Sequence, residues 1–449
     1  MAGVSDNVVP YTDQALFLAL RGTGEEAAMQ IVWTYEHPVD IDGLRRFHAE
    51  FGQGLVARHI EPSPVPFGRH RWVAATGPQC DIDMDDSVRP RAELLDWVNE
   101  HLQLPIDPQR GPGWRMGVQR FDDGATAVSL VATHCVADGG GFIGRAIDTI
   151  NGKSRDLGYP RAGSRTRRQA VAADLRQTAR DLPEIIRTLG RAAKVGVARR
   201  HELVRPKTAQ PAVTGGKHRV QVPNVAVYID AKGWDARAES LGGNSYSLLA
   251  GFCAKLAEHQ GRVRAADGVV TLMIPVSERE GDDDTGGNVV SIANVSFDPT
   301  QVTKDLSGPR AAIRQGLKTA REVPDEMVQL LPLIPFLPKR AFAKTVDMTF
   351  GFSEDLPVSC SNLGDLSASL LSVDGTPAEY INLRGVDRYI TDEALQRRCG
   401  VLTLVSGRVG DQVTIAVVAW QPGLENTTAR LRDVVAQTLA EFELTGVIE

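Results

Sequence analysis

The stretch VATHCVADGGGFIGRAI, residues 131–147, is the part of the sequence that decides the fold. It holds two overlapping motifs that indicate different proteins. Gly139, Gly141 and Gly144 have the G-x-G-x-x-G spacing of a loop that cradles a dinucleotide pyrophosphate at a helix N-terminus. His134, Asp138 and Gly139 instead form H-x-x-x-D-G, in which a histidine at the end of a strand can act as a general base. The surrounding sequence must distinguish a cofactor loop from a proton acceptor.

The dinucleotide alternative lacks the context that it requires. A dinucleotide-binding unit needs a second strand after the glycine motif and an acidic residue about 20 positions further on. Here the motif is followed by RAIDTINGKSRDLGYPRAGSRTRRQ, residues 145–169, which contains no second apolar strand and becomes basic. The glycine spacing alone is weak, so the sequence favours the histidine motif.

His134 ends the apolar stretch ATAVSLVATH, residues 125–134, which has the composition of a strand covered on both faces. Its ring is therefore expected at the mouth of a cleft, where a neutral imidazole can accept a proton. We expect Asp138 to hold the loop by pairing with an arginine, and Gly139 to keep a side chain out of the space that reactants need. The alternative is a hydrogen-bonded core histidine beside an aspartate that only caps a helix.

The composition restricts the class of protein. A chain of 449 residues exceeds the usual size of one hydrophobic core, so two domains are expected. The net charge of −6 argues against a nucleic-acid binder. The cysteines are scattered without a C-x-x-C motif, which indicates a reducing cytoplasm and predicts no metal site. There is no basic region before the first apolar run and no apolar run long enough to span a bilayer.

The pattern along the chain predicts two α/β lobes, each with a mixed sheet and helices. The expected division is an N-terminal lobe at residues 1–161, a basic helical connector at 162–217 and a C-terminal lobe at 218–449. Strands are predicted at 114–121 and 125–134, and again as a hairpin at 400–420. A cleft between the lobes is the expected place for the site.

Four segments resemble the chloramphenicol-acetyltransferase-like superfamily. That superfamily includes condensation domains, polyketide-associated acyltransferases and the wax ester synthase/diacylglycerol acyltransferase group. The segment PIDPQRGPGWRMGVQRFDDGATAVSLVATHCVADGGG is similar to the superfamily's hairpin leading into H-x-x-x-D-G. GGNSYSLLAGFCAKLAEHQG, IPVSEREGDDDTGGN and SCSNLGDL follow in the order of the wax ester group's Asn-Asp helix, P-V-S-x-R element and SN element. Thr133 and Ser245 depart from relatives that carry a second histidine or an Asn-Asp pair, and no proline follows Asn362.

The resemblance implies a fold with two such lobes and the active site at their interface. It implies an acyltransferase in which His134 is the general base for acyl transfer from a CoA or carrier-protein thioester. It also implies that Arg279, in the P-V-S-x-R element, is the partner of Asp138, and that Asn362 can contact the oxyanion or the substrate. The acceptor stays open between a hydroxyl and an amine, lipids and glycolipids included. No cofactor is expected beyond the thioester, with acyl-CoA or phosphopantetheine as co-substrate.

Several alternatives remain open at this level. We favour ester formation because no carrier or adenylation domain is recognisable, but a condensation-type amide-forming enzyme and a catalytically silent carrier-protein-binding module are the alternatives. The arginines of the connector can attract CoA phosphates or an acidic carrier, or they can be a solvated helix face. The stretch MVQLLPLIPFLP, residues 327–338, can line an acyl channel, touch a membrane surface or cover the core. GDDDTGG lacks the spacing of a calcium loop.

Overall fold

The computed structural model describes residues 7–75, 77–154, 156–198, 216–281, 284–323, 326–337 and 355–449. The first half of the chain folds as α1 (Tyr11–Thr23), β1 (Glu26–Tyr35), α2 (Ile41–Phe51), β2 (His59–Glu61), β3 (Arg71–Val73), β4 (Asp83–Arg89), η1 (Arg91–Glu93), α3 (Leu94–Leu102), β5 (Trp114–Phe121), β6 (Thr126–Thr133) and α4 (Gly139–Ile150). The long helix α5 (Arg167–Ala198) follows, where the connector was predicted to be helical. The part of the connector at 199–215 lies outside the described residues.

The second half contains β7 (Asn224–Asp230), α7 (Ala231–Ser240), α8 (Ser245–His259), β8 (Val270–Ser277), β9 (Val290–Phe297), α9 (Ser307–Glu322), α10 (Glu326–Leu330) and η2 (Leu331–Phe336). It continues with β10 (Val358–Leu366), η3 (Ala368–Leu371), β11 (Tyr380–Arg388), α12 (Asp392–Arg397), β12 (Val401–Val409), β13 (Gln412–Trp420), α13 (Thr428–Glu441) and β14 (Gly446–Ile448). Among the described residues, none of these helices combines the length and apolar character needed to cross a bilayer.

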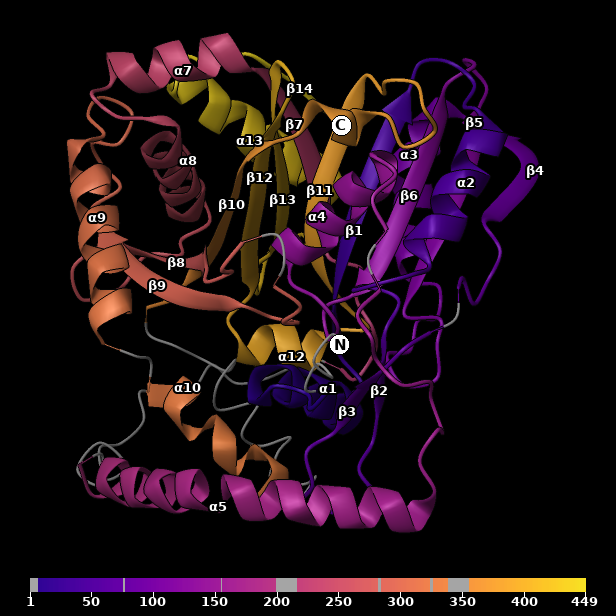
Figure 1. Ribbon diagram of the computed structural model, residues 1–449. Coiled ribbons are helices and arrows are strands. Elements are labelled where there is room, and N and C mark those ends of the chain that lie inside the picture. The colour runs from indigo at the N-terminus through magenta and orange to yellow at the C-terminus, as the bar shows by residue number, and fades with distance from the viewer. Residues whose placement is uncertain are drawn as a thin grey trace.

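Two mixed sheets with helices packed on them make up the two lobes (Figure 1). The first sheet has the strand order β11-β1-β6-β5-β4, and the second has the order β14-β7-β13-β12-β10-β8-β9. Every residue of β6 is buried, as expected for a central strand that ends at the site. The helices α2 and α4 bury their apolar faces in the core of the first sheet, and α8 and α13 do so in the core of the second. The predicted fold class is confirmed.

One strand departs from the expected division at residue 218. β11 comes from the second half of the chain, yet it pairs antiparallel with β1 from Glu26↔Arg388 to Thr34↔Tyr380 and completes the first sheet. The sequence pattern did not indicate this strand, because its buried residues include charged ones. Arg388 lies buried 3.0 Å from the carboxylate of Glu26. The first sheet therefore contains one strand, β11, from the second half of the chain.

Polar side chains between the two sheets hold β11 in place. Burial lowers the pKa of Arg384 to about 9, and its guanidinium bonds to the side-chain oxygens of Gln30, Asn99 and Asn224. Asn224 belongs to β7 of the second sheet, whereas Gln30 belongs to β1 of the first. Because a buried guanidinium is costly without partners, this network fixes the relative position of the two sheets.

Candidate active site

His134 lies in the turn directly after β6, and its backbone is held by both halves of the chain. Its N–H donates to the carbonyl of Ala27 on β1, at 3.0 Å. Its carbonyl accepts a hydrogen bond from Nδ2 of Asn288, which precedes β9, at 2.9 Å. The position of the imidazole is therefore set by one strand of the first sheet and one loop of the second lobe.

The ring of His134 is neither sealed nor freely exposed. The residue is half-buried, and Nδ1 is buried without a hydrogen-bond partner among the described residues. Asp387 of β11 lies opposite Ala27 in the strand pairing, so His134 and Asp387 flank Ala27 on the same face of the sheet. Desolvation raises the pKa of Asp387, although two-fifths of its side chain is exposed, and the charges of Arg398 and His134 oppose the rise.

Asp138 begins α4 and is one of the most buried acids of the site. Its Oδ1 accepts the backbone N–H of Gly141 at 2.7 Å, which caps the helix. Its Oδ2 accepts the backbone N–H of Val289 at 2.9 Å and a hydrogen bond from Arg279 at 2.8 Å. The helix cap that was considered as an alternative is thus present together with the predicted ion pair.

The guanidinium of Arg279 joins the H-x-x-x-D-G loop to the second lobe. Besides Asp138, it donates to the carbonyls of Gly287 at 2.8 Å, Gly286 at 3.4 Å and Asp284 at 3.3 Å. The backbone N–H of Asp138 donates in turn to the carbonyl of Gly287, at 3.0 Å. Since both charges are largely buried and fully hydrogen-bonded, the pair works as a structural clamp.

Three further residues support this clamp, and the motif did not reveal them as site residues. Asp13 of α1 accepts both the backbone N–H and Nδ2 of Asn288 at 2.8 Å, and burial raises its pKa. Arg58 is buried, stacks 3.9 Å from the ring centre of Trp72, and donates to the carbonyls of Val136 and Thr285. Asn288 is the last residue of the segment IPVSEREGDDDTGGN, whose resemblance to the wax ester group was the one available signal. Asp13 and Arg58 lie far from any motif.

Gly139 and Gly141, two of the three glycines at the start of α4, differ in how much space surrounds them. A Cβ on Gly139 would meet only Cδ2 of Leu363, at the ordinary distance of 3.5 Å. A Cβ on Gly141 would lie 2.7 Å from Nη2 of Arg279 and 3.1 Å from Cδ2 of Leu55. Within the protein, Gly141 is therefore the glycine at which a side chain would displace its neighbours. The expectation that Gly139 leaves space for reactants stays a prediction.

Asn362 lies on β10 of the second sheet, at an irregularity in the pairing of β10 with β12. Its Oδ1 accepts the backbone N–H of Gly364 at 2.8 Å. The hydrogen-bond donor of this side chain is Nδ2. The next residue, Leu363, is the neighbour of Gly139 described above. The structure thus brings this part of β10 to the start of α4, while the role of Asn362 stays a prediction.

The structure places the other candidate features as follows. Arg165 of the connector pairs with Glu61 and Asp174 and is not free to attract phosphates, whereas Arg167, Arg168, Arg176 and Arg180 are exposed. The apolar stretch at 327–337 forms α10 and η2, and η2 packs between α1 and α5. Pro338, together with Asp282 and Asp283 of the acidic loop, lies outside the described residues. The described part of the chain holds no cluster of three or more His, Cys, Asp or Glu side chains suited to a metal.

Two cavities on the molecule lie away from His134. One lies at the N-terminal end of α13 and is lined by residues such as His259, Trp420 and Arg430. The other, of about 280 Å³, lies beside the edge strand β4 and is lined by residues such as Asp83, Trp97 and His101. The cleft expected between the lobes therefore stays a prediction.

Comparison with known proteins bears on the fold. No family model and no curated protein matches the sequence. Among solved structures, the first condensation domain of the calcium-dependent antibiotic synthetase, in complex with substrate analogue 2a, has a TM-score of 0.56 at 13% identity, covering 98% of this chain and 99% of that one. The wax ester synthase/diacylglycerol acyltransferase from Marinobacter aquaeolei VT8 has a TM-score of 0.52 at 16% identity, covering 97% and 98%. The X-domain from teicoplanin biosynthesis has a TM-score of 0.50 at 13% identity, covering 99% and 95%.

At these identities the likeness establishes the fold and not the activity. It extends over nearly the whole of each chain. The chain therefore has the same fold as this condensation domain and this wax ester synthase/diacylglycerol acyltransferase, as expected from the sequence resemblance.

Proposed function

We propose that the protein is an acyltransferase that moves an acyl group from a CoA or carrier-protein thioester to a hydroxyl or amine acceptor. The observation that carries the proposal is the placement of His134. Its backbone is clamped from both halves of the chain, and its half-buried ring has Nδ1 turned into the protein. Nε2 is then the nitrogen left to face a substrate.

The chemistry follows from that ring. His134 accepts the proton of the acceptor O–H or N–H while the oxygen or nitrogen attacks the thioester carbonyl carbon. The carbon–sulfur bond then breaks, and the proton passes from the imidazolium to the departing thiolate, which gives an ester or amide and a free thiol. Asp387 lies on the same face of the sheet as His134, where its carboxylate can favour the imidazolium between the two steps. Asp138 and Arg279 keep the loop in position and do not take part in proton transfer.

The similar structures support the choice of reaction class. One is a condensation domain bound to a substrate analogue, and another is a wax ester synthase/diacylglycerol acyltransferase. These two names span amide-type and ester-type products, so both acceptor classes belong in the test. The proposed donor is a thioester whether the product is an ester or an amide.

The experiment is a measurement of thiol release by the purified full chain. Acyl-CoA and acyl-carrier protein are offered as donors, each with a long-chain alcohol or a primary amine as acceptor, and the products are identified by mass spectrometry. We expect acceptor-dependent thiol release that is absent from His134→Ala. Release no faster than that of His134→Ala with every donor would reject the proposal, and tight binding of carrier protein without turnover would favour a docking module instead.

A further inference from the structure

We infer that the outer face of α5 docks on a membrane surface that contains anionic phospholipids. This goes beyond the proposed acyl transfer and does not depend on it. The helix runs along the base of the molecule, on the side away from both sheets (Figure 1). It contains 32 residues and packs against η2 and α10 on its inner side.

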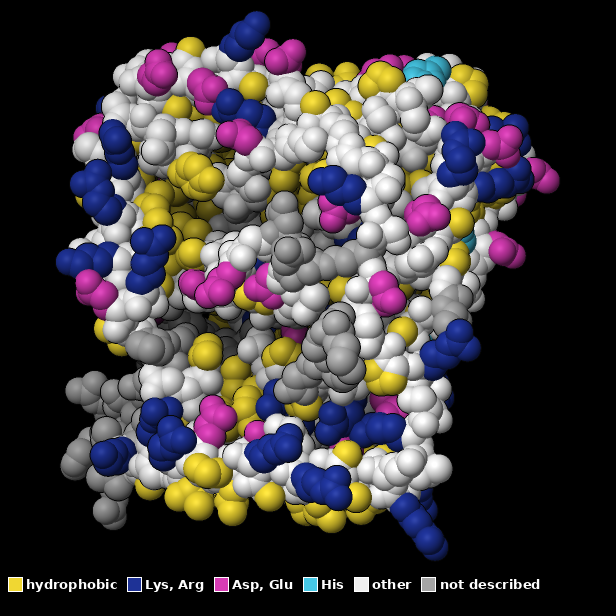
Figure 2. Space-filling view, viewed as in Figure 1, with side chains coloured by type: hydrophobic (Ala, Val, Ile, Leu, Met, Phe, Trp, Pro, Cys, Tyr) yellow, Lys and Arg dark blue, Asp and Glu magenta, His cyan; other side chains and the backbone are white. Residues whose placement is uncertain are grey.

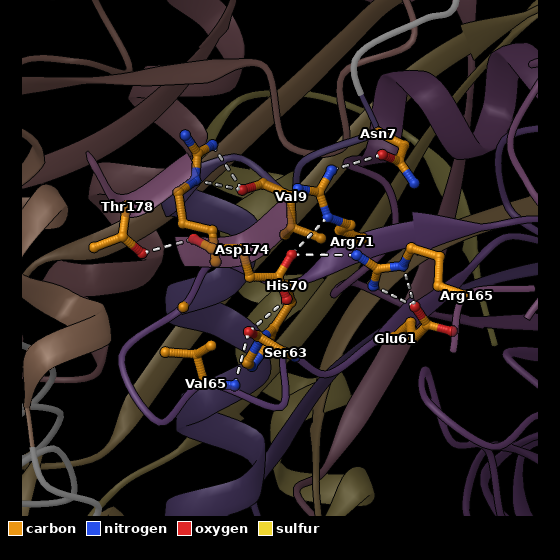
Figure 3. Close-up of polar contacts among 12 residues, drawn as sticks. Asn7, Val9, Glu61, Ser63, Val65, His70, Arg71, Arg165, Asp174 and Thr178 are labelled. Atoms are coloured by element: carbon orange, nitrogen blue, oxygen red, sulfur yellow. Dashed lines mark hydrogen bonds and ion pairs between the residues drawn. The ribbon is translucent and has the colours of Figure 1, made fainter. Parts of the chain in front are cut away.

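The inner side of α5 is firmly attached to the body of the protein. Asp174, which is fully buried, accepts hydrogen bonds from Arg71 at 2.9 Å, Arg165 at 3.2 Å and the hydroxyl of Ser63 at 2.7 Å (Figure 3). Ile185 and Thr188, further along the same side, are buried as well. Because the helix is fixed by these contacts, its other faces are held toward the surroundings.

A continuous apolar ridge occupies the face next to the attached one. Its members recur at helical spacing and are about half exposed: Leu175 (47%), Leu182 (49%), Ile186 (59%) and Leu189 (54%). At about 100° per residue they lie within an arc of about 60°, and at 1.5 Å per residue they extend over about 21 Å. Single exposed apolar residues need no explanation, but an aligned row on a projecting helix does.

Basic side chains line the helix beside this ridge (Figure 2). The helix carries seven Lys and Arg residues against three acids, in a chain whose net charge is −6. Two of the acids, Asp174 and Asp181, pair with arginines of the body, so that Glu184 is the exposed acid of the helix. All seven basic residues are exposed: Arg167, Arg168, Arg176, Arg180, Arg187, Arg191 and Lys194.

This combination fits a lipid surface better than a second copy of the chain. A convex ridge of leucine and isoleucine can enter the boundary between headgroups and acyl chains, while the neighbouring arginines reach anionic headgroups. A second copy of the chain would bring two rows of like charge together. The concentration of positive charge on one helix of an acidic chain selects an anionic bilayer.

The test uses the full chain and vesicles of phosphatidylcholine, either alone or mixed with phosphatidylglycerol. We expect the protein to float with the mixed vesicles at low ionic strength and to bind them less at high salt. Leu182→Gln with Ile186→Gln should weaken binding at least about tenfold. Arg180→Gln with Arg191→Gln should weaken it by roughly fivefold per arginine. The matched control is Met84→Gln with Val88→Gln, two residues of β4 that are 48% and 54% exposed, and it should bind like the wild type.

Three outcomes would overturn the inference. The first is a folded wild type that does not bind the mixed vesicles. The second is unchanged binding by the Leu182/Ile186 variant, which would mean that the ridge does not insert. The third is a dimer in sedimentation that the same variant dissociates, which would make the ridge an interface between copies of this chain. None of these outcomes depends on thiol release, so the proposed acyl transfer is tested separately.

Discussion

Arg279 and Asp138 are 141 residues apart in the chain, yet their side chains meet at 2.8 Å and join the two lobes at the H-x-x-x-D-G loop. Both are largely buried, with 14% and 4% of their side chains exposed. The carboxylate also caps α4, and the guanidinium also holds the loop before β9. One ion pair thus sets the start of the helix, the loop of the second lobe and the turn that carries His134.

Removing the charge of Asp138 should therefore reduce both stability and activity. In Asp138→Asn, the amide nitrogen would face the N–H groups of Val289 and Arg279, where the carboxylate accepts both. We expect a loss on the order of 3–5 kcal/mol in the free energy of unfolding, measured by denaturant titration. Arg279→Met and the double variant Asp138→Asn/Arg279→Met complete a double-mutant cycle. The double variant should lose less free energy of unfolding than the two single variants lose together.

The control for this cycle is Asp42→Asn, which breaks an exposed ion pair with Arg45 and should cost less than about 1 kcal/mol. Stability that is unchanged in Asp138→Asn while activity falls would show that Asp138 takes part in the chemistry, against the structural role assigned here.

His134→Ala should abolish acyl transfer and leave the fold intact. A general base contributes about 100- to 10,000-fold, so the rate should fall within that range. His37, which is also half-buried but lies at the end of β1 remote from the motif, provides the control variant His37→Ala. The measurements are initial rates of thiol release and melting temperatures. Near-full turnover by a well-folded His134→Ala protein would remove the catalytic assignment.

Gly139 and Gly141, at the start of α4, should respond differently to alanine. Gly141→Ala places a methyl group 2.7 Å from Nη2 of Arg279 and should displace the guanidinium from Asp138. We expect a lower melting temperature and lower activity. Gly139→Ala makes only an ordinary contact, and alanine favours the helix by up to about 1 kcal/mol, so its melting temperature should hold or rise. If Gly139 leaves space for reactants, this variant should still lose activity. A Gly141→Ala protein as stable as the wild type would show that the Arg279–Asp138 pair can shift without loss of stability.

The pH dependence of stability should carry a contribution from His70, which lies half-buried beside Asp174, the anchor of α5 (Figure 3). Burial lowers its pKa to about 4, whereas the unfolded chain has a histidine pKa near 6.5. Between these values the unfolded state binds a proton that the folded state does not, so stability falls as the pH falls from about 6.5 to about 4. In addition, Nδ1 accepts the N–H of Ser63 at 3.2 Å, a bond that protonation would break.

The expected result for His70→Gln is a melting temperature that changes less than that of the wild type across this range, with a difference of roughly 2 °C or more. The exposed His218 provides the control variant His218→Gln, whose profile should follow that of the wild type. Parallel profiles for the wild type and His70→Gln would show that the folded protein accommodates a charged His70.

The local sequence was sufficient for much of the fold because the signals were local. The apolar run at 125–134 predicted β6, and the periodicity of the connector predicted α5. The H-x-x-x-D-G spacing identified His134 and Asp138, since a strand end, a tight turn and a helix cap are encoded within a few residues. The resemblance supplied Arg279 as the partner of Asp138, which the structure shows.

Tertiary structure alone decided β11 and the supports of the site. The segment YINLRGVDR did not have the pattern of a buried strand, because the partners that make burial of Arg384 and Arg388 possible come largely from elsewhere in the chain, among them Gln30, Asn99, Asn224 and Glu26. Asp13 and Arg58 became site residues for the same reason. A buried charge is stable only where distant partners meet it, and no local pattern records those partners. The sequence thus singled out the residues that we propose to carry the chemistry, and the packing of the two lobes determined what holds them in place.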